Sequence, residues 1–429
     1  MYTRCTCKEF DKLWQREVYE YYSPPGIFEV HKRTRLWGRD RHWGRHRTKH
    51  WFYCDPQTMP LLTFYTQPDE PYRPKKDPFC EVMTNKGKEN EDVKMCLAKV
   101  KQFLQREGKR SLIWLVHGLN GNEKKMKRGP EWPLLKDALL NNYPNSIVGL
   151  VIWEKAASPF TGWGFVQSRK LPTGLLPSTY HNSAISAWPI GNILAYVNYE
   201  IYSGCPSCPS SEFADTYCIG HSIGAHLCGF YGKMMKRLKR EVEKILALDP
   251  AGPIFDKHKG VYKLQSSDAN FVEVWHSNTH RLGYQKTLGH VDIYINGGFN
   301  QPNCGVGFGL MEGNSHKFAY RILKTIVDLS GRCVAEWLCR TPKPGVEQWC
   351  ALKNIKKENV KKLILAGCTK TFTKKFHIGQ LERSETPDIM DNDVYWIEIT
   401  PNSRTCPENK TPQHVPVGLY CYYQYLAVY

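Results

Sequence analysis

A chain of 429 residues is long enough to bury a full-sized core, and its 41% apolar and 13% aromatic content excludes wholesale disorder. The formal net charge of +18 favours anionic partners such as lipid surfaces and carries no information about the fold. No apolar run reaches the roughly 18 residues of a membrane-spanning helix, so none is predicted.

The cysteine content predicts an oxidising environment. The chain carries 16 cysteines, an even and high number that favours several disulfides and a secreted protein. The first 30 residues, however, lack the apolar stretch of roughly 7 to 15 residues that a secretory signal needs. Either the protein stays inside the cell with free thiols or its natural start lies further upstream, and we expect the second. Cys205 and Cys208 are expected to close a disulfide loop, because no second such pair completes a zinc site.

Residues 1–55 form a basic, Arg/Trp-rich N-terminal segment that we expect to be disordered. Between His31 and His50 there are eight Lys or Arg, four His and two Trp, too little apolar surface to fold alone. Such a segment is either an arm that meets anionic lipid or nucleic acid, or a solvated tail that is absent from the mature protein. We expect the tail, and no nucleic-acid partner, since no nucleic-acid-binding motif accompanies the charge.

Residues 56–429 show globular patterning and are predicted to form one domain. Runs of apolar residues, and apolar spacing of about 3.6 residues, separate strands from helices. Strands are predicted at residues 61–66, 111–116, 147–153, 216–219, 244–248, 271–276 and 290–296, and helices at residues 93–104, 182–202, 223–239 and 315–327.

The loop after the strand at 111–116 is a candidate oxyanion-binding loop. It reads His117-Gly118-Leu119-Asn120-Gly121, and a glycine-containing loop after an early strand is where an α/β-hydrolase places one oxyanion donor. The backbone N–H groups of Leu119 and Ile223 would be the pair. An ordinary strand-to-helix turn is the alternative.

Gly220-His221-Ser222-Ile223-Gly224 fits the Gly-x-Ser-x-Gly nucleophile elbow, in which a strand turns sharply into a helix and leaves a serine at the tip. A predicted strand precedes the motif and a predicted helix, with Leu227 and Cys228 among its apolar positions, follows it. The glycines are expected because strand and helix approach closely on either side of the serine. Ser222 is therefore the candidate nucleophile; the alternative is a serine that caps the helix.

Asp249 directly follows the strand at 244–248, where the hydrolase fold places the acid that orients a histidine. Asp256 and Asp268 lie in predicted loops and Asp292 inside a strand, so position favours Asp249, although Asp-Pro also initiates turns. Among the later histidines, which are His258, His276, His280, His290 and His316, His316 alone is expected on a loop after the last core strand and before a helix. That position lets a base reach Ser222 from above the sheet.

The motifs Cys218–Phe230, Leu248–Pro253 and Leu288–Gly298, with Gln301-Pro302 after them, resemble the pancreatic lipase family, and its phospholipase A1 members in particular. The similarity runs from about residue 60 to residue 421. It implies an α/β-hydrolase fold with a mostly parallel central sheet flanked by helices. It also implies a triad of Ser222, Asp249 and His316, with Leu119 and Ile223 as oxyanion donors.

The family comparison also predicts departures. A cysteine usually stands where this chain has Asn314, so Cys304 needs another partner. The lid, Gly305 to Gly313 with Gly305, Val306, Phe308, Leu310 and Met311, is short, as is the loop from Ser277 to Gly289. Short loops leave the site open to a bulky charged head group. Of the acidic positions of the calcium site in some relatives, Asp268 alone matches, so no metal and no cofactor are expected.

After residue 330 the resemblance predicts disulfide-tied outer strands with no C-terminal lipid-binding sandwich. It implies a phospholipase A1 that releases the sn-1 fatty acid of phospholipids at an interface. The charge implies peripheral contact with anionic membranes, without an obligate protein partner. The alternatives are a triacylglycerol lipase with the same mechanism and an inactive lipase-like binding protein.

Overall fold

The computed structural model describes residues 59–67, 77–86, 90–106, 110–157, 178–202, 215–257, 262–279, 281–298, 301, 312–329, 334–340, 375–381, 393–397, 399–400 and 413–414. The N-terminal segment 1–55, the pair Cys205 and Cys208, His258, His280, Cys304 and the lid residues Gly305, Val306, Phe308, Leu310 and Met311 lie outside these ranges. The predictions made for them remain predictions.

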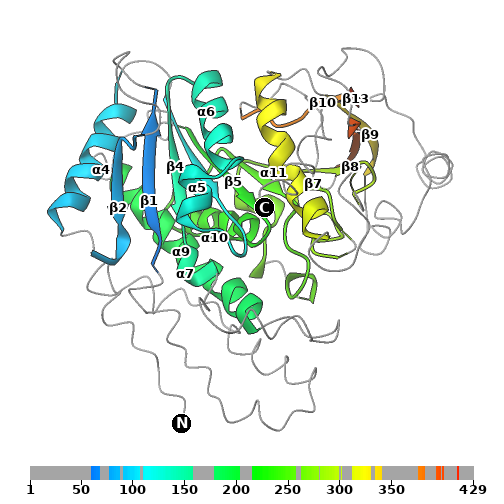
Figure 1. The fold of residues 1–429 in the computed structure, drawn as a ribbon, viewed down its shortest axis with the longest axis horizontal. Helices are drawn as coiled ribbons and strands as arrows, with labels where there is room; N and C mark the ends of the chain where they lie inside the picture. Colours follow the sequence, from blue (N-terminus) through cyan, green and yellow to red (C-terminus); the bar gives the residue numbers. More distant parts are fainter. Residues whose placement is uncertain are drawn as a thin grey trace, which may run out of the picture.

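The described part of the chain is built around one sheet of eleven strands, in the spatial order β10-β9-β11-β8-β7-β6-β5-β3-β4-β1-β2. The strands are β1 (Leu61–Thr66), β2 (Cys80–Met83), β3 (Ser111–Val116), β4 (Ser146–Ile152), β5 (Asp215–His221), β6 (Lys244–Leu248), β7 (Phe271–His276), β8 (Val291–Ile295), β9 (Val334–Arg340), β10 (Lys375–His377) and β11 (Asp393–Ile397). Figure 1 shows β1 and β2 at one end of this sheet and β9 and β10 at the other. Two short strands, β12 (Ile399–Thr400) and β13 (Gln413–His414), pair separately.

The sheet is mostly parallel. From β4 through β3, β5, β6, β7 and β8 to β11 every neighbouring pair is parallel, whereas β1, β2, β9 and β10 pair antiparallel at the edges. The central strands are buried along their whole length, as a parallel sheet covered on both faces requires. The carboxyl ends of these parallel strands therefore meet at one edge, where ligand sites of open α/β sheets form.

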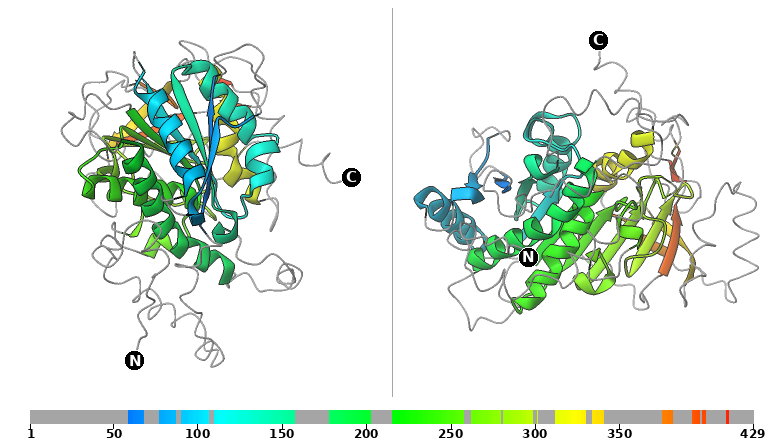
Figure 2. Two further views of the ribbon diagram at one scale, coloured as in Figure 1. Left: turned by 90° about the vertical axis from the view of Figure 1, so that its left-hand side faces the viewer. Right: turned by 90° about the horizontal axis from the view of Figure 1, so that it is seen from below.

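Helices cover both faces. They are α4 (Glu91–Leu104), α5 (Glu123–Arg128), α6 (Trp132–Asn142), α7 (Glu154–Ala157), α9 (Ser178–Tyr202), α10 (Ile223–Arg237) and α11 (Glu312–Asp328), with the 3₁₀ turns η4 (Thr84–Lys86), η7 (Phe255–Lys257) and η9 (Ser266–Asp268). The apolar residues of α4, α9 and α10 form one core cluster with the sheet, and those of α6 and α11 form a second. Figure 2 shows the strands between these two helix layers. No helix in the described ranges combines the length and apolar character needed to cross a bilayer.

The α/β architecture with a mostly parallel sheet is confirmed, and the strands predicted at 61–66, 111–116, 244–248 and 271–276 have the observed bounds. The start of α11 was predicted wrongly. The helix begins at Glu312, so His316 lies inside its first turns rather than on a preceding loop, and the last two residues of the expected lid are helical. The sheet also continues past β8, because β11 pairs in parallel with it.

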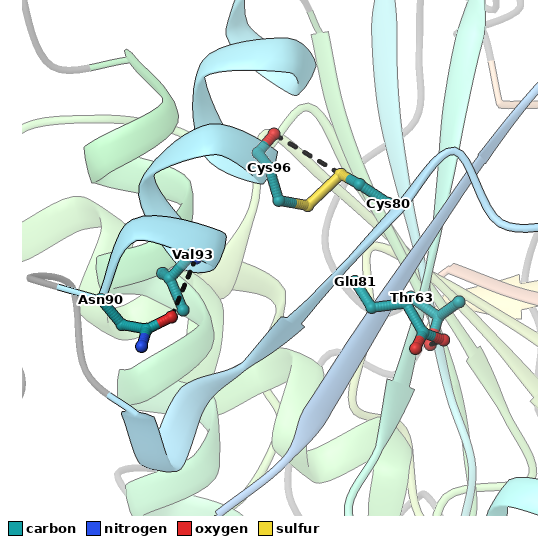
Figure 3. The surroundings of a disulfide bond; sticks show 6 residues. All are labelled: Thr63, Cys80, Glu81, Asn90, Val93 and Cys96. Carbon is teal, nitrogen blue, oxygen red and sulfur yellow. Dashed lines mark hydrogen bonds between the residues drawn. A yellow bond between two sulfur atoms is a disulfide. The ribbon is translucent and has the colours of Figure 1, made fainter.

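Two disulfides lie in the described ranges, Cys80–Cys96 and Cys218–Cys228. The first ties β2 to α4, whose N-terminus is capped by Asn90 accepting a hydrogen bond from Val93 N–H (Figure 3). The second joins the strand before Ser222 to the helix after it. Cys228 was expected as an ordinary apolar helix position, and it is instead half of this buried cross-link. The pairing follows from the strand-to-helix turn, which periodicity alone does not reveal.

Candidate active site

Ser222 stands at the turn between β5 and α10. Its backbone has φ 59° and ψ −122°, outside the regions that a residue with a side chain normally adopts. Such a conformation costs on the order of 1–3 kcal/mol and persists when the surrounding structure enforces it. Here Ser222 N–H donates to Leu248 O at 3.1 Å, which ties the turn to the neighbouring strand β6.

The glycines of the motif have a measurable steric reason. A Cβ added at Gly220 would lie 2.3 Å from Gly224 O, and one added at Gly224 would lie 2.5 Å from His117 O. Both distances are far below van der Waals contact, and both involve backbone atoms that cannot rotate away. Strand, helix and the loop after β3 therefore converge on the serine, as the motif predicts.

His316 lies between Ser222 and Asp249. Its Nε2 is 2.7 Å from Ser222 Oγ, and its Nδ1 is 2.5 Å from Asp249 Oδ2. Ser222 and His316 are 3% and 8% exposed and Asp249 is fully buried. Because a carboxylate only accepts, Nδ1 carries the hydrogen and Nε2 is left to accept the proton of the serine hydroxyl. The structure thus brings together three residues that are far apart in the chain.

Asp249 is held rigidly after β6. Its backbone has a positive φ of 45°, and its N–H donates to Trp275 O at 2.7 Å. The carboxylate oxygen that does not face His316, Oδ1, accepts from the N–H groups of Ser277 at 2.8 Å and Asn278 at 3.0 Å. Two backbone donors therefore determine which oxygen is presented to the histidine.

A second histidine supports the first. His221, the residue before Ser222, donates from Nε2 to the backbone carbonyl of His316 at 2.9 Å, and its ring lies 4.7 Å from the rings of both His316 and Tyr320. Burial, and then the nearby His316, lower the pKa of His221 well below its usual value. A neutral His221 donates this bond without adding charge beside the base.

The candidate oxyanion loop passes directly against the serine. A Cβ added at Gly118 would lie 2.7 Å from Ser222 Cβ, so the backbone of Gly118 packs against the serine. Leu119 is the next residue in the loop. His117 stabilises the loop: its Nδ1 donates to Gly118 O at 2.8 Å, and its Nε2 accepts from Trp153 N–H at 3.1 Å. Burial lowers the pKa of His117 to about 4, in keeping with a neutral ring.

Ile223 is the first residue of α10. The N–H groups of a helix's first turn have no acceptor within the helix and point toward negative charge. Ile223 directly follows Ser222, and Leu119 directly follows Gly118, which lies against Ser222. The assignment of their N–H groups as oxyanion donors remains a prediction.

The other acidic and histidine candidates have different partners. Asp292 pairs with His276 at 2.7 Å, both of them fully buried. Asp268, which matches one acidic position of the calcium site in some relatives, forms an ion pair with the Lys233 ammonium group at 2.5 Å. Within the described ranges no cluster of three or more His, Cys, Asp or Glu side chains is arranged to hold a metal ion.

Sequence reasoning missed the residues that lock α11 to the sheet. Gln301 donates from Nε2 to Ser277 O and Ile295 O, each at 2.9 Å, and its N–H donates to Ser315 Oγ at 3.1 Å. Ser277 Oγ in turn donates to Ser315 O at 2.8 Å. These bonds fix the start of the helix that carries His316. The Gln-Pro pair in the sequence was the only available signal.

A serine on a strained strand-to-helix turn, next to a histidine held by a buried carboxylate, is the geometry by which proteins activate a hydroxyl for attack on an acyl carbon. On a mostly parallel sheet flanked by helices, it places the chain among α/β proteins with a serine-hydrolase type of site.

Comparison with known proteins narrows this class. Residues 208–312 match the family model described as Lipase, a range that includes Ser222 and Asp249 and ends before His316. Phospholipase A1 of Vespula squamosa is 39% identical over 136 residues, 31% of this chain and 43% of that protein. Phospholipase A1 of Vespa crabro is 35% identical over 147 residues, 34% of this chain and 47% of that protein. Lipase member H of Xenopus tropicalis is 39% identical over 126 residues, 29% of this chain and 25% of that protein.

The resemblance to the pancreatic lipase family, with its phospholipase A1 members, is thereby confirmed. The matched part of the chain spans less than half the length of each of these three relatives.

Proposed function

We propose that this chain is a carboxylic-ester hydrolase of lipids, a phospholipase A1 that releases the sn-1 fatty acid of phospholipids, with Ser222, His316 and Asp249 as its catalytic triad. The observation that carries the proposal is the position of His316, within 2.7 Å of the serine hydroxyl and 2.5 Å of a buried carboxylate. The lipase-family match and the phospholipase A1 relatives support the lipid ester as substrate class.

In the first step His316 Nε2 takes the proton of Ser222 Oγ as this oxygen attacks the ester carbonyl carbon. The carbonyl oxygen becomes an anion, and the N–H groups of Leu119 and Ile223 stabilise it. Each such donor contributes roughly 3–4 kcal/mol, because it points at charge that exists only in the transition state. His316 then passes its proton to the leaving alcohol, which is the lysophospholipid.

In the second step His316 takes a proton from water, and the hydroxide attacks the acyl-enzyme. The fatty acid leaves and Ser222 recovers its proton. Throughout, Asp249 holds the imidazole in the tautomer with hydrogen on Nδ1 and stabilises the imidazolium that forms twice in each cycle. The backbone donors of Ser277 and Asn278 keep this carboxylate in place.

Phospholipid is proposed over triacylglycerol because the sequence from Gly305 to Gly313 leaves few residues to cover the site, and because the net charge of +18 would concentrate the protein at anionic membranes. We further propose a secreted protein, since the two disulfides Cys80–Cys96 and Cys218–Cys228 suit an oxidising compartment.

The test uses phosphatidylcholine vesicles with different acyl chains at sn-1 and sn-2, and Ser222→Ala as the inactive control. Release of the sn-1 acid by the wild type alone would support the proposal in full. Cleavage of triolein without cleavage of phospholipid would reject the substrate and keep the mechanism. Inactivity on both, in folded and oxidised protein, would favour a lipase-like binding protein.

A further inference from the structure

His276, the last residue of β7, is buried with an acceptor at each ring nitrogen. Its Nδ1 lies 3.0 Å from Tyr284 O and its Nε2 lies 2.7 Å from Asp292 Oδ1. A carbonyl oxygen and a carboxylate oxygen both accept hydrogen bonds, so each ring nitrogen must carry a hydrogen. The ring is therefore an imidazolium.

The negative partner is equally well defined. Both carboxylate oxygens of Asp292 accept from backbone N–H groups, those of Leu288 at 3.1 and 3.2 Å and of Gly289 at 2.9 Å. Hydrogen bonds donated to a carboxyl group stabilise its ionised form, so the hydrogen between Asp292 Oδ1 and His276 Nε2 is placed on the nitrogen. His276 and Asp292 are fully buried, and buried charges persist when they are paired and hydrogen-bonded. The pair is an internal ion pair.

The ion pair adjoins the two residues that hold Asp249. Ser277 and Asn278, whose N–H groups donate to Asp249 Oδ1, directly follow His276. The other end of this loop lies beside its start, because His276 Nδ1 donates a hydrogen bond to the carbonyl oxygen of Tyr284.

The returning end of the loop is packed against the strand end that carries Asp249. Tyr284 N–H donates to Pro250 O at 2.6 Å. A Cβ added at Gly283 would lie 2.5 Å from Asp249 Oδ1, so the loop touches the carboxylate. Movement of Tyr284 O away from His276 would therefore move both the donors and the contact surface of Asp249.

We propose that His276 is a positioning residue for the hydrolytic reaction: as an imidazolium paired with Asp292, it closes the loop from Ser277 to Tyr284 and so fixes the two backbone donors that orient Asp249. The inference rests on the proposed function for its catalytic consequence. The two bonds have separate tasks. The bond to Tyr284 O sets the geometry at Asp249, and the bond to Asp292 neutralises the buried charge.

Two substitutions separate these tasks. In His276→Gln the side-chain amide nitrogen lies near the former Nε2 and can reach Asp292 but not Tyr284 O. In His276→Asn the amide nitrogen lies near the former Nδ1 and can reach Tyr284 O but not Asp292. We expect His276→Gln to lower kcat for a soluble short-chain ester about 10- to 100-fold, with KM changed less than about twofold, because small displacements of a catalytic group are costly.

His276→Asn should keep kcat within about threefold of the wild type. Both variants should lower the thermal midpoint, because neither amide side chain replaces the cation beside the buried Asp292. The difference in kcat therefore reports the bond to Tyr284 O. His377→Asn is the control, an exposed histidine on β10 at the far edge of the sheet, and it should leave both kcat and the thermal midpoint unchanged. Long-range proton–nitrogen spectra of histidine-labelled protein should show a ring protonated on both nitrogens whose signal His276→Gln removes.

Three outcomes would overturn the inference: unchanged kcat in His276→Gln, equal loss in both His276 variants, or an unprotonated nitrogen in the assigned His276 ring. Labelling of Ser222 by a phosphonate reagent separates this failure from failure of the function. If the wild type neither hydrolyses esters nor is labelled, the proposed function fails and the catalytic role falls with it. An active wild type with an unaffected His276→Gln variant removes the positioning role alone.

Discussion

The sharpest prediction concerns Asp249→Asn, a substitution that replaces one carboxylate oxygen by an NH₂ group in a fully buried side chain. The environment decides how the new amide is oriented. Position Oδ1 faces the N–H groups of Ser277 and Asn278, so the amide oxygen must occupy it. The amide NH₂ group is then forced toward His316 Nδ1, where the wild type has an acceptor at 2.5 Å.

Two donors cannot face one another, so His316 must move its hydrogen from Nδ1 to Nε2. The nitrogen next to Ser222 Oγ would then be unable to take the serine proton. Loss of the correct tautomer costs about 10⁴-fold in rate for a serine–histidine–aspartate site, which corresponds to about 5 kcal/mol of transition-state stabilisation. We expect a loss of this size in kcat/KM, with little change in stability.

The assay is hydrolysis of a water-soluble p-nitrophenyl ester, which avoids any effect on binding to a lipid surface. Asp256→Asn is the matched control, because Asp256 is exposed in the 3₁₀ turn that follows the same strand end. A folded Asp249→Asn variant that kept more than about one tenth of the wild-type kcat/KM would refute the reasoning, since no tautomer effect would be that small.

Three further predictions concern stability. Gly224→Ala would place a Cβ 2.5 Å from His117 O and 2.6 Å from Val116 O, and we expect it to lower the free energy of unfolding in urea by about 1–3 kcal/mol and to reduce activity; an unchanged denaturation midpoint would show that the loop yields. The double substitution Cys218→Ala/Cys228→Ala opens a loop with a sequence separation of 10 and should cost about 3 kcal/mol of unfolding free energy, whereas an unaltered stability would mean that the cross-link does not restrain the unfolded chain. Burial lowers the pKa of His117 from 6.5 to about 4, so between these pH values the unfolded chain binds a proton that the folded chain does not. The contribution of His117 to stability is therefore complete above about pH 6.5 and falls by about 3 kcal/mol as the pH approaches 4. His117→Asn should abolish this decline in urea titrations at each pH.

Much of the central layer was predictable from the sequence because the relevant forces are local. The strands at 111–116 and 244–248 are short apolar runs that are buried on both faces, and such runs have little choice of conformation. The short helices α5 and α6 were not predicted, because Glu123–Arg128 is charged at nearly every position and its helical state depends on the Asn122 cap and on packing of Met126.

The candidate site was predictable to the extent that chain order and element ends carry it. Gly220 and Gly224 on either side of Ser222 indicate the turn, and Asp249 marks the end of the next strand. The reason given for His316 was partly wrong, since the residue lies inside α11 rather than before it. It still reaches the serine because the helix starts above the carboxyl ends of the strands.

By itself, the sequence determined the order of the central strands and the identity of the turn that presents Ser222, because apolar periodicity and glycine sterics act over a few residues. Only the tertiary structure decided which backbone donors hold Asp249, and that Cys218 pairs with Cys228 and His276 with Asp292. These contacts join segments that become neighbours only when the sheet has formed, so their geometry depends on the packing of the whole fold rather than on any local stretch of chain.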